Sequence, residues 1–316
     1  MFIGLDLGGS RIKAVALSPD GAVGARAQAP TPGSGVEAVL QGMGDLGHTV
    51  RGAARLAGVG AALPGVVDMD AGEARFLPNV PGDWARVAVA DRLAATLGAP
   101  VHLLNDARAA TFGEWCFGAG QGCGDFVLIA VGTGIGGGIV SGGRLLLGSG
   151  GHAGEVGHVA LQPHGPRCGC GAHGCAEAVA SGPALVAAAA RVVAQGLPTA
   201  LRAACGGDLG RLTPRLISEA AAGGDNAAGE LLADLAERLG TLAASLVVVL
   251  NPRRVVVGGG LALAGAPLLE GVRATLRARA GWYLAHAPTE VVPAALGEWA
   301  GALGAAAWAR RATLGG

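Results

Sequence analysis

Lysine is almost absent from this sequence, aromatic residues are few, and neither sign of charge is in excess. Lys13 is the only lysine, the 23 basic residues equal the 23 acidic ones, and the formal net charge is zero. No basic stripe stands out, which argues against binding to nucleic acid or to an anionic membrane. We attribute the near-complete use of arginine in place of lysine to compositional bias rather than to function.

Long apolar runs are also missing, although 51% of the residues are hydrophobic. The run from Leu242 to Leu250 stops at the polar segment 251–254, too early to cross a bilayer. The N-terminus has no basic segment and carries an acid at Asp6, so it does not resemble a signal peptide. We therefore expect a cytoplasmic protein whose six cysteines stay reduced.

Strands alternate with helices along the 316 residues, which predicts an α/β fold in two lobes. A strand, a glycine turn with a hydroxyl residue, and a second strand occur twice, about 120 residues apart. This repeat predicts a duplicated fold with a ligand cleft between its halves. The expected strands are 2–6, 12–17, 59–63, 101–104, 126–131, 139–140 and 255–257, and the expected helices are 36–56, 84–97, 107–117 and 302–312.

Three glycine clusters follow predicted strands: Gly8-Gly9-Ser10, Gly132-Thr133-Gly134 and Gly258-Gly259-Gly260. Glycine lets backbone N–H groups approach a phosphate closely, and the hydroxyls of the first two turns add donors. Asp6, at the end of the first strand, is placed to hold Mg²⁺ through water. The third cluster offers a flat surface for a base or ribose. Each turn is also compatible with an ordinary tight connection, and the spacing of a Walker loop is absent.

Asn105-Asp106 lies between a predicted strand and a predicted helix. An Asp at this point is a common helix N-cap. The helix N-terminus would also keep the carboxylate ionised near neutral pH, as a general base for a hydroxyl requires. The local sequence is compatible with both roles.

A cluster of thiols and imidazoles is the strongest local signal. His158, Cys168, Cys170 and Cys175 form a Cys₃His set suited to tetrahedral Zn²⁺, and four protein ligands leave no open position, so such a zinc is structural rather than catalytic. The alternatives are His173, His164 or His152 as the histidine ligand, or free thiols in a loop. Cys116, Cys123 and Cys205 are isolated and expected to be packing residues. Glu155 and Glu177 flank the cluster, where carboxylates can accept hydrogen bonds from sugar hydroxyls or simply face solvent.

Taken together, these motifs resemble the ROK family of sugar kinases and sugar-responsive repressors, within the actin-like ATPase superfamily, and most of all its bacterial glucokinases. The most specific element is the run Cys168-x-Cys170-Gly171-x-x-Gly174-Cys175-x-Glu177, preceded by Glu155-x-Gly157-His158. The glycine clusters and Asn105-Asp106 follow in the family's order. The resemblance covers nearly the whole chain.

The resemblance implies an ATP-dependent hexose kinase that uses Mg²⁺ and a structural Zn²⁺, with Asp106 as the base for the sugar 6-hydroxyl. The implied sugar contacts are Asn79, Asn105, Asp106, Glu155, His158 and Glu177. The implied nucleotide contacts are Asp6, Gly8, Gly9, Ser10, Lys13, Gly132, Thr133, Gly134, Gly258, Gly259 and Gly260. It also implies a small lobe of residues 1–115 and 300–316, a large lobe of residues 116–299, and a homodimer or homotetramer.

Several alternatives stay open beside glucose. Ser10 stands where the family usually has threonine, and the same pattern occurs in polyphosphate-using glucokinases, although those generally lack the zinc cysteines. The same sugar-facing residues serve kinases of N-acetylmannosamine, N-acetylglucosamine or allose. A sugar-responsive repressor is disfavoured, because repressors of this family carry a helix-turn-helix segment before the residue that corresponds to Asp6.

Overall fold

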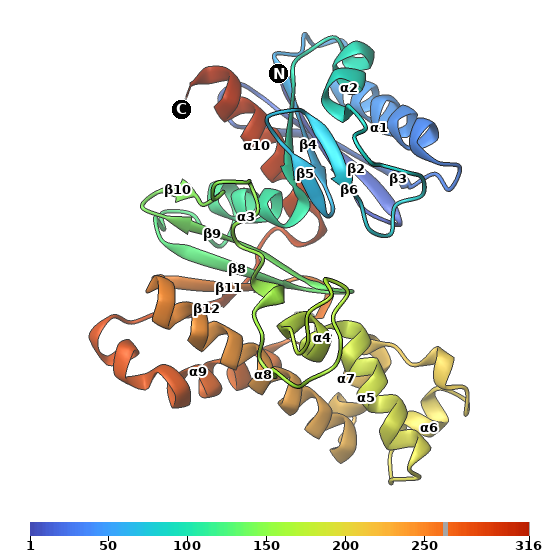
Figure 1. Ribbon diagram of the computed structural model, residues 1–316, viewed down its shortest axis with the longest axis vertical. Helices are drawn as coiled ribbons and strands as arrows, with labels where there is room; N and C mark the ends of the chain where they lie inside the picture. The colour runs from blue at the N-terminus through green and yellow to red at the C-terminus, as the bar shows by residue number, and fades with distance from the viewer. Residues whose placement is uncertain (262–264, 316) are drawn as a thin grey trace.

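The computed structural model describes residues 1–261 and 265–315 and contains two five-stranded sheets of the same order (Figure 1). The first runs β3 (Val23–Pro30), β2 (Arg11–Leu17), β1 (Phe2–Leu7), β4 (Gly58–Leu63) and β7 (Val101–Asn105). The second runs β10 (Arg144–Leu145), β9 (Ile135–Ser141), β8 (Phe126–Val131), β11 (Arg254–Gly258) and β12 (Glu290–Pro293). In each sheet three antiparallel neighbours are followed by two strands that run parallel to the third. The predicted duplication is therefore confirmed.

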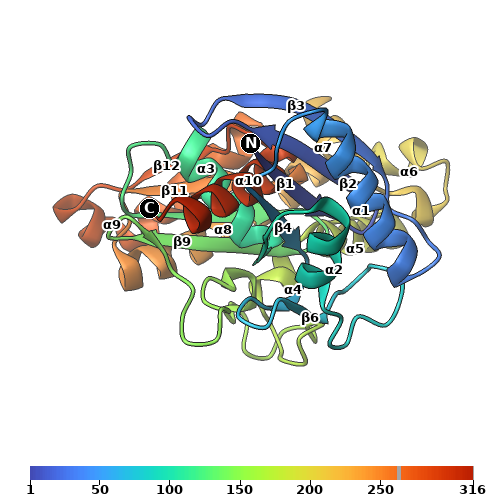
Figure 2. The ribbon, with the colours of Figure 1, turned by 90° about the horizontal axis from the view of Figure 1, so that it is seen from above.

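The helices cover the outer faces of the sheets and fill the layer between them (Figures 1 and 2). The long ones are α1 (Val36–Arg51), α2 (Val89–Leu97), α3 (Asp106–Phe117), α5 (Gly182–Ala194), α7 (Pro214–Ala222), α8 (Asn226–Leu250), α9 (Ala266–His286) and α10 (Ala300–Leu314). The described residues also form two short helices, α4 (Ala176–Ala180) and α6 (Leu201–Ala204), and a two-stranded sheet of β5 (Val66–Asp68) and β6 (Glu73–Phe76).

Alternating residues of the central strands point to different cores. Ile3 and Leu5 of β1 belong to a cluster with α1 and α2, whereas Phe2 belongs to a cluster with α3 and α10. Strand β8 behaves in the same way: Val127 packs in the cluster of α5, α8 and α9, and Phe126 packs in the central one. This alternation is the pattern of strands buried on both faces, and it places α3 and α10 between the two sheets.

Glycine allows α3 and α10 to pack closely against each other. A Cβ at Gly304 would lie 1.7 Å from the carbonyl oxygen of Ala109, and a Cβ at Gly113 would lie 2.3 Å from that of Ala300. Any larger residue would push the two helices apart. The start of α3, where Asp106 lies, is consequently held on a rigid helix pair in the middle of the molecule.

A buried carboxylate joins the two segments by which the chain passes between the sheets. The side chain of Glu114, 1% exposed, accepts hydrogen bonds from the backbone N–H groups of Ala119, Ala295 and Leu296. Ala119 follows α3 on the way to β8, and the other two residues lie between β12 and α10. The buried charge is thus satisfied by backbone donors at the point where the lobes are connected.

Two predicted helices were too long. The first ends at Arg51 rather than near Leu56, because Gly52 adopts a φ of 57° and stops it. The second begins at Val89 rather than at Trp84, because the preceding segment turns at Arg86, which has a φ of 60°. Within the described residues, none of the helices combines the length and the apolar character needed to span a membrane.

Candidate active site

The carboxyl ends of two parallel strands bring Asp6 and Asp106 to the same edge of the first sheet. In the strand register, Asp6 of β1 pairs with Ala62 of β4, whose neighbour Leu63 pairs with Asn105 of β7. Asp106 is the next residue and the first of α3. The edge formed by the carboxyl ends of parallel strands is where ligands bind in open α/β sheets.

The helix cap at this point is Asn105 and not Asp106, which corrects the expectation from the sequence. The Asn105 Oδ1 accepts hydrogen bonds from the N–H groups of Ala107 and Arg108, and its Nδ2 donates to the carbonyl of Gly65 at 3.0 Å. One amide hydrogen of Asn105 is therefore left for a ligand. Because its neighbour performs the capping, the Asp106 carboxylate is available for chemistry.

The Asp106 carboxyl is also harder to ionise than expected. Burial and, after it, the negative charge of Asp6 raise the pKa of Asp106 to about 7, against the lowering effect of the hydrogen bond from Ala107 N–H. The expected stabilisation of the anion by the helix N-terminus is thus outweighed by desolvation. The pKa of Asp6 is likewise raised to about 6, because burial outweighs the lowering effect of the Lys13 ammonium 3.9 Å away.

Three separate segments meet at the start of β9. A Cβ at Gly136 would lie 2.8 Å from the Cβ of Ala107, the residue after Asp106. A Cβ at Gly137 would lie 2.5 Å from Cγ2 of Val156, the residue after Glu155. The backbone N–H of Ile135 donates a 3.0 Å hydrogen bond to Oε2 of Glu177. The start of α3, the Glu155 segment and the start of α4 therefore converge directly after the second glycine turn.

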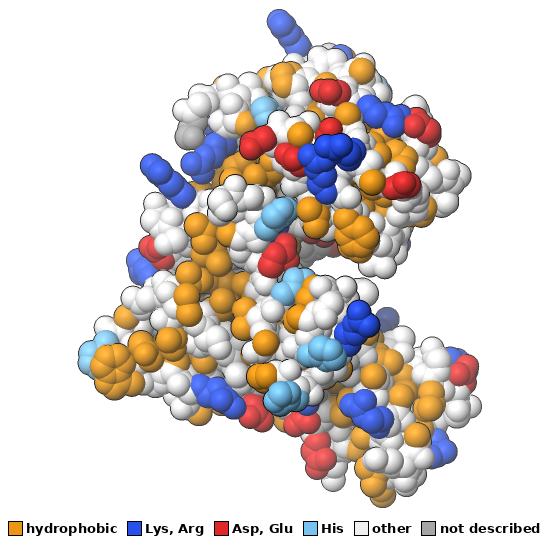
Figure 3. All heavy atoms as spheres, in the orientation of Figure 1, with side chains coloured by type: hydrophobic (Ala, Val, Ile, Leu, Met, Phe, Trp, Pro, Cys, Tyr) orange, Lys and Arg blue, Asp and Glu red, His pale blue; other side chains and the backbone are white. Residues whose placement is uncertain are grey.

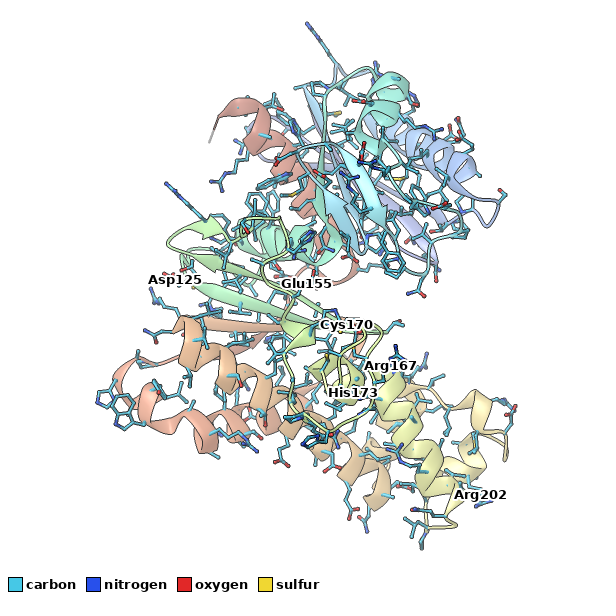
Figure 4. All side chains as sticks on the ribbon, viewed as in Figure 1. Asp125, Glu155, Arg167, Cys170, His173 and Arg202 are labelled. Atoms are coloured by element: carbon cyan, nitrogen blue, oxygen red, sulfur yellow. The ribbon has the colours of Figure 1, made fainter. Side chains whose placement is uncertain are left out.

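Arg108 is the main site residue that the sequence did not reveal. Its side chain is 1% exposed, its Nη2 donates to Oε1 of Glu155 at 3.0 Å, and its Nε donates to the carbonyl of Ala153 at 2.8 Å. Figure 4 shows Glu155 where the two lobes meet. A charged residue in a short helix normally predicts a solvated side chain, so only the tertiary structure exposes this role.

The four predicted metal ligands lie together. One ligand atom from each of His158, Cys168, Cys170 and Cys175 falls within 4.8 Å of all the others. The Sγ atoms of Cys170 and Cys175 are 3.7 Å apart, close to the edge of about 3.8 Å that a ZnS₄-like tetrahedron with 2.3 Å bonds would have. The donor set and its spacing fit a tetrahedral Zn²⁺.

The competing histidines lie outside this cluster. His173 is exposed and its Nδ1 is 3.2 Å from the carbonyl of Gly165, and neither His164 nor His152 belongs to the described set of ligand atoms. Among the other cysteines, Cys123 and Cys205 are buried and Cys116 is half-buried, as packing residues would be. Figure 4 places Cys170 and His173 on the same loop, below Glu155.

The glycine clusters surround the same region. The exposed Gly9 approaches Asn79, since a Cβ there would lie 2.8 Å from the Asn79 carbonyl oxygen, and Asn79 itself has a φ of 60°. The third cluster adjoins the second turn: Gly258 pairs with Ala130, and a Cβ at Gly259 would lie 2.3 Å from the carbonyl oxygen of Val131. The hydroxyl residues Ser10 and Thr133 are exposed. Figure 3 shows the surface hollowed between the two lobes.

Lys13 lies between two acids. Its Nζ is 3.9 Å from Oδ2 of Asp6 and 3.9 Å from Oε2 of Glu298, just before α10. The only amine side chain of the protein therefore lies beside Asp6 at the end of the first strand. A cation here offsets the cost of burying the Asp6 carboxylate.

Comparison with known proteins agrees with this arrangement. The sequence model of the ROK family matches residues 2–312. A glucokinase of Thermotoga maritima is 36% identical over 313 residues, covering 96% of this chain and 95% of that protein. An N-acetylmannosamine kinase of Escherichia coli is 34% identical over 263 residues, covering 83% of this chain and 84% of that protein.

A similar solved structure identifies the fold. The ROK family glucokinase from Streptomyces griseus, in complex with glucose and AMPPNP, has a TM-score of 0.84 and 34% identity and covers 98% of this chain and 99% of that one. The two lobes therefore adopt the actin-like ATPase fold, as the sequence indicated. With the family model spanning almost all of its length, this chain belongs to the ROK family.

Proposed function

We propose that this protein is a glucokinase, which transfers the γ-phosphoryl group of ATP to the 6-hydroxyl of glucose. The observation that carries the proposal is the convergence of Asp106, the second glycine turn and the Glu155–Glu177 region at the start of β9. The glucokinase identity of relatives that match over nearly the full chain supports it.

Asp106 acts as the general base in this proposal. A carboxylate with a pKa of about 7 is half ionised at neutral pH and accepts a proton more readily than an ordinary aspartate does. It takes the proton of the 6-hydroxyl as that oxygen attacks phosphorus. The sugar is held around it by Asn79, Asn105, Glu155, His158 and Glu177. Closure of the lobes over both substrates excludes water and aligns the reacting atoms.

The nucleotide lies on the opposite side of the cleft. Its phosphates bind the backbone and hydroxyl groups of the two glycine turns, and its adenosine binds the surface of Gly258-Gly259-Gly260. Asp6 and Lys13 face the phosphates and the Mg²⁺ that accompanies them. That ion supplies positive charge against the phosphate oxygens when it is bound.

A structural zinc braces the sugar-binding segment. His158 Nδ1 faces the Sγ of Cys168 at 3.6 Å, which supports Nδ1 as the metal ligand and Nε2 as the contact to a sugar hydroxyl. Because a metal-bound imidazole has a fixed orientation, the zinc would orient His158 toward the sugar.

Two further proposals come from the resemblance. The chain divides into a small lobe of residues 1–115 and 300–316 and a large lobe of residues 116–299, and two or four copies of it assemble.

A sugar panel tests the proposal. Turnover is measured with ATP and with polyphosphate for glucose, N-acetylmannosamine, N-acetylglucosamine and allose. We expect glucose with ATP to give the highest kcat/KM. The relative from Escherichia coli makes N-acetylmannosamine the second candidate. Clear turnover of that sugar without turnover of glucose would replace our assignment, and turnover with polyphosphate alone would change the donor.

A further inference from the structure

The buried guanidinium of Arg108 links helix α3, which carries the proposed base Asp106, to the segment that carries Glu155. Arg108 heads the fully buried side chains of the described residues when these are ranked by size. It lies two residues after Asp106 on α3, and it reaches the segment that carries Glu155 through two acceptors, the Ala153 carbonyl and the Glu155 carboxylate. No regular helix or strand supports Ala153 or Glu155 themselves.

Burial makes this ion pair a strong geometric constraint. An arginine that is 1% exposed needs an acceptor, since an unpaired buried charge is very costly. Its planar guanidinium holds two acceptors in fixed relative directions, whereas an ammonium on a flexible stem does not fix that geometry. Glu155 is itself 43% exposed and contacts Arg108 through Oε1, which leaves Oε2 for a ligand. The residue before Glu155 is Gly154, whose backbone has a φ of 89°.

We propose that Arg108 is a positioning residue for catalysis: it fixes the orientation of the Glu155 carboxylate that binds the sugar, and it does so from the helical turn that carries the base. The proposal rests on the assignment of Glu155 as a sugar contact and of Asp106 as the base. Recognition of the hydroxyl pattern and proton acceptance are thereby built on one rigid element, α3, which α10 holds in place.

The positive charge of Arg108 also affects the pKa of Asp106. The groups that act on Asp106 are Asp6 and Glu155, which raise its pKa, and Arg108, which lowers it. Asp6 is in turn paired with Lys13 of β2. Replacing the guanidinium by a neutral group removes the positive charge nearest to the base along α3, so the acid limb of the rate profile moves to higher pH.

The test separates charge from geometry. Arg108→Lys keeps the positive charge but loses the rigid planar geometry that fixes both acceptors, so we expect the KM for the sugar to rise about tenfold while the acid limb of kcat stays in place. Arg108→Gln should raise KM and also shift that limb upward. Arg254→Lys is the matched control, because Arg254 likewise holds a carboxylate, that of Glu290, and a carbonyl, that of Ala119, at the opposite end of β11.

A double-mutant cycle with Glu155→Gln decides whether Arg108 acts through Glu155. We expect Arg108→Lys to add no further rise in sugar KM when Glu155 is already Gln. If Arg108→Lys changes KM no more than Arg254→Lys does, or if its effect persists in full beside Glu155→Gln, the inference is wrong. If instead Glu155→Gln alone leaves KM unchanged, the sugar contact in the proposed function is wrong.

The same cycle measured by thermal unfolding keeps the two failures distinct, because it needs no substrate. Coupling between the Arg108 and Glu155 substitutions in the unfolding temperature is expected whichever sugar the enzyme prefers. Additive effects on unfolding would mean that the two side chains do not restrain each other, and the positioning role would be rejected even for an active glucokinase.

Discussion

The Oε2 atom of Glu177 accepts a 3.0 Å hydrogen bond from the backbone N–H of Ile135. Ile135 follows the glycine turn that is proposed to bind phosphate, and Glu177 follows the last cysteine of the metal cluster by two residues. The Sγ of Cys168 also lies 3.7 Å from the other carboxylate oxygen. In the proposed function, the Glu177 side chain therefore connects the sugar site to the turn that binds the nucleotide phosphates, so a substitution at one should affect binding at the other.

We expect Glu177→Ala to raise the KM for both ATP and glucose about tenfold, because the second glycine turn loses its acceptor and the sugar loses a contact. Glu177→Gln retains a carbonyl oxygen for Ile135, so its KM for ATP should stay near that of the native enzyme while its KM for glucose rises. Initial-rate kinetics in both substrates measures this, with Glu219→Gln on the exposed face of α7 as control. A KM for ATP that is unaffected by Glu177→Ala would show that the link carries no function.

The base assignment predicts a selective loss of kcat. Asp106→Asn keeps the shape of the side chain but removes the proton acceptor, so we expect kcat to fall by about 10²–10⁴ with little change in either KM. Circular dichroism should show an unchanged fold, since Asn105 and not Asp106 caps α3. In the native enzyme, kcat/KM should fall as the pH drops below about 7, because the carboxylate then becomes protonated. Near-native turnover by Asp106→Asn would contradict the role of base.

The same carboxyl should make the fold less stable in alkali. The pKa of Asp106 is raised on folding to about 7, so its favourable contribution is complete below the unfolded value near 4 and is lost as the pH rises through 7. Asp106→Asn removes this titration and should raise the unfolding temperature at pH 8 by roughly 2–4 °C, corresponding to about 1 kcal/mol for a side chain that is partly exposed. The gain should vanish at pH 4.

Asp91→Asn on the exposed side of α2 provides the control for this measurement. It should give no gain at either pH. An equal gain from Asp106→Asn at pH 4 and pH 8 would mean that packing, and not ionisation, is responsible.

Much of this fold is readable from the sequence, because the central strands are buried on both faces. Strands β4, β8 and β11 are short apolar runs closed by proline or glycine, and each was predicted to within one residue at either end. Strand β3 was not predicted, because most of its residues are exposed and its sequence, VGARAQAP, has no apolar run. Position in the sheet, rather than local composition, makes it a strand.

The candidate site shows the same difference: some of its features depend on local sequence and could be predicted, and others depend on the tertiary structure and could not. The spacing of Cys168, Cys170 and Cys175 already indicated that they bind one metal ion together, because few residues separate them. The pKa of Asp106 could not be predicted, since it depends on burial and on Asp6, 100 residues away in the chain. The ion pair of Arg108 could not be predicted for the same reason, because its partner Glu155 is 47 residues away in the chain.

The metal cluster leads to the last prediction. Cys170→Ser should reduce the zinc content from about one ion per chain to near zero, because a neutral hydroxyl is a poor fourth ligand. Losing the brace frees His158 and the adjoining segment, so the unfolding temperature should fall by several degrees and the KM for glucose should rise. Elemental analysis, thermal unfolding and kinetics measure the three effects on one preparation.

Two control variants bracket the zinc result. Cys116→Ser removes a thiol outside the cluster, and His173→Ala removes an imidazole of the same loop whose Nδ1 lies 3.2 Å from the Gly165 carbonyl. Both should keep a full complement of zinc. Retention of zinc by Cys170→Ser would exclude that thiol as a ligand, whereas loss of zinc in His173→Ala would move the histidine ligand from His158 to His173. The second outcome would change which imidazole the metal orients toward the sugar, because His158, unlike His173, lies three residues after Glu155.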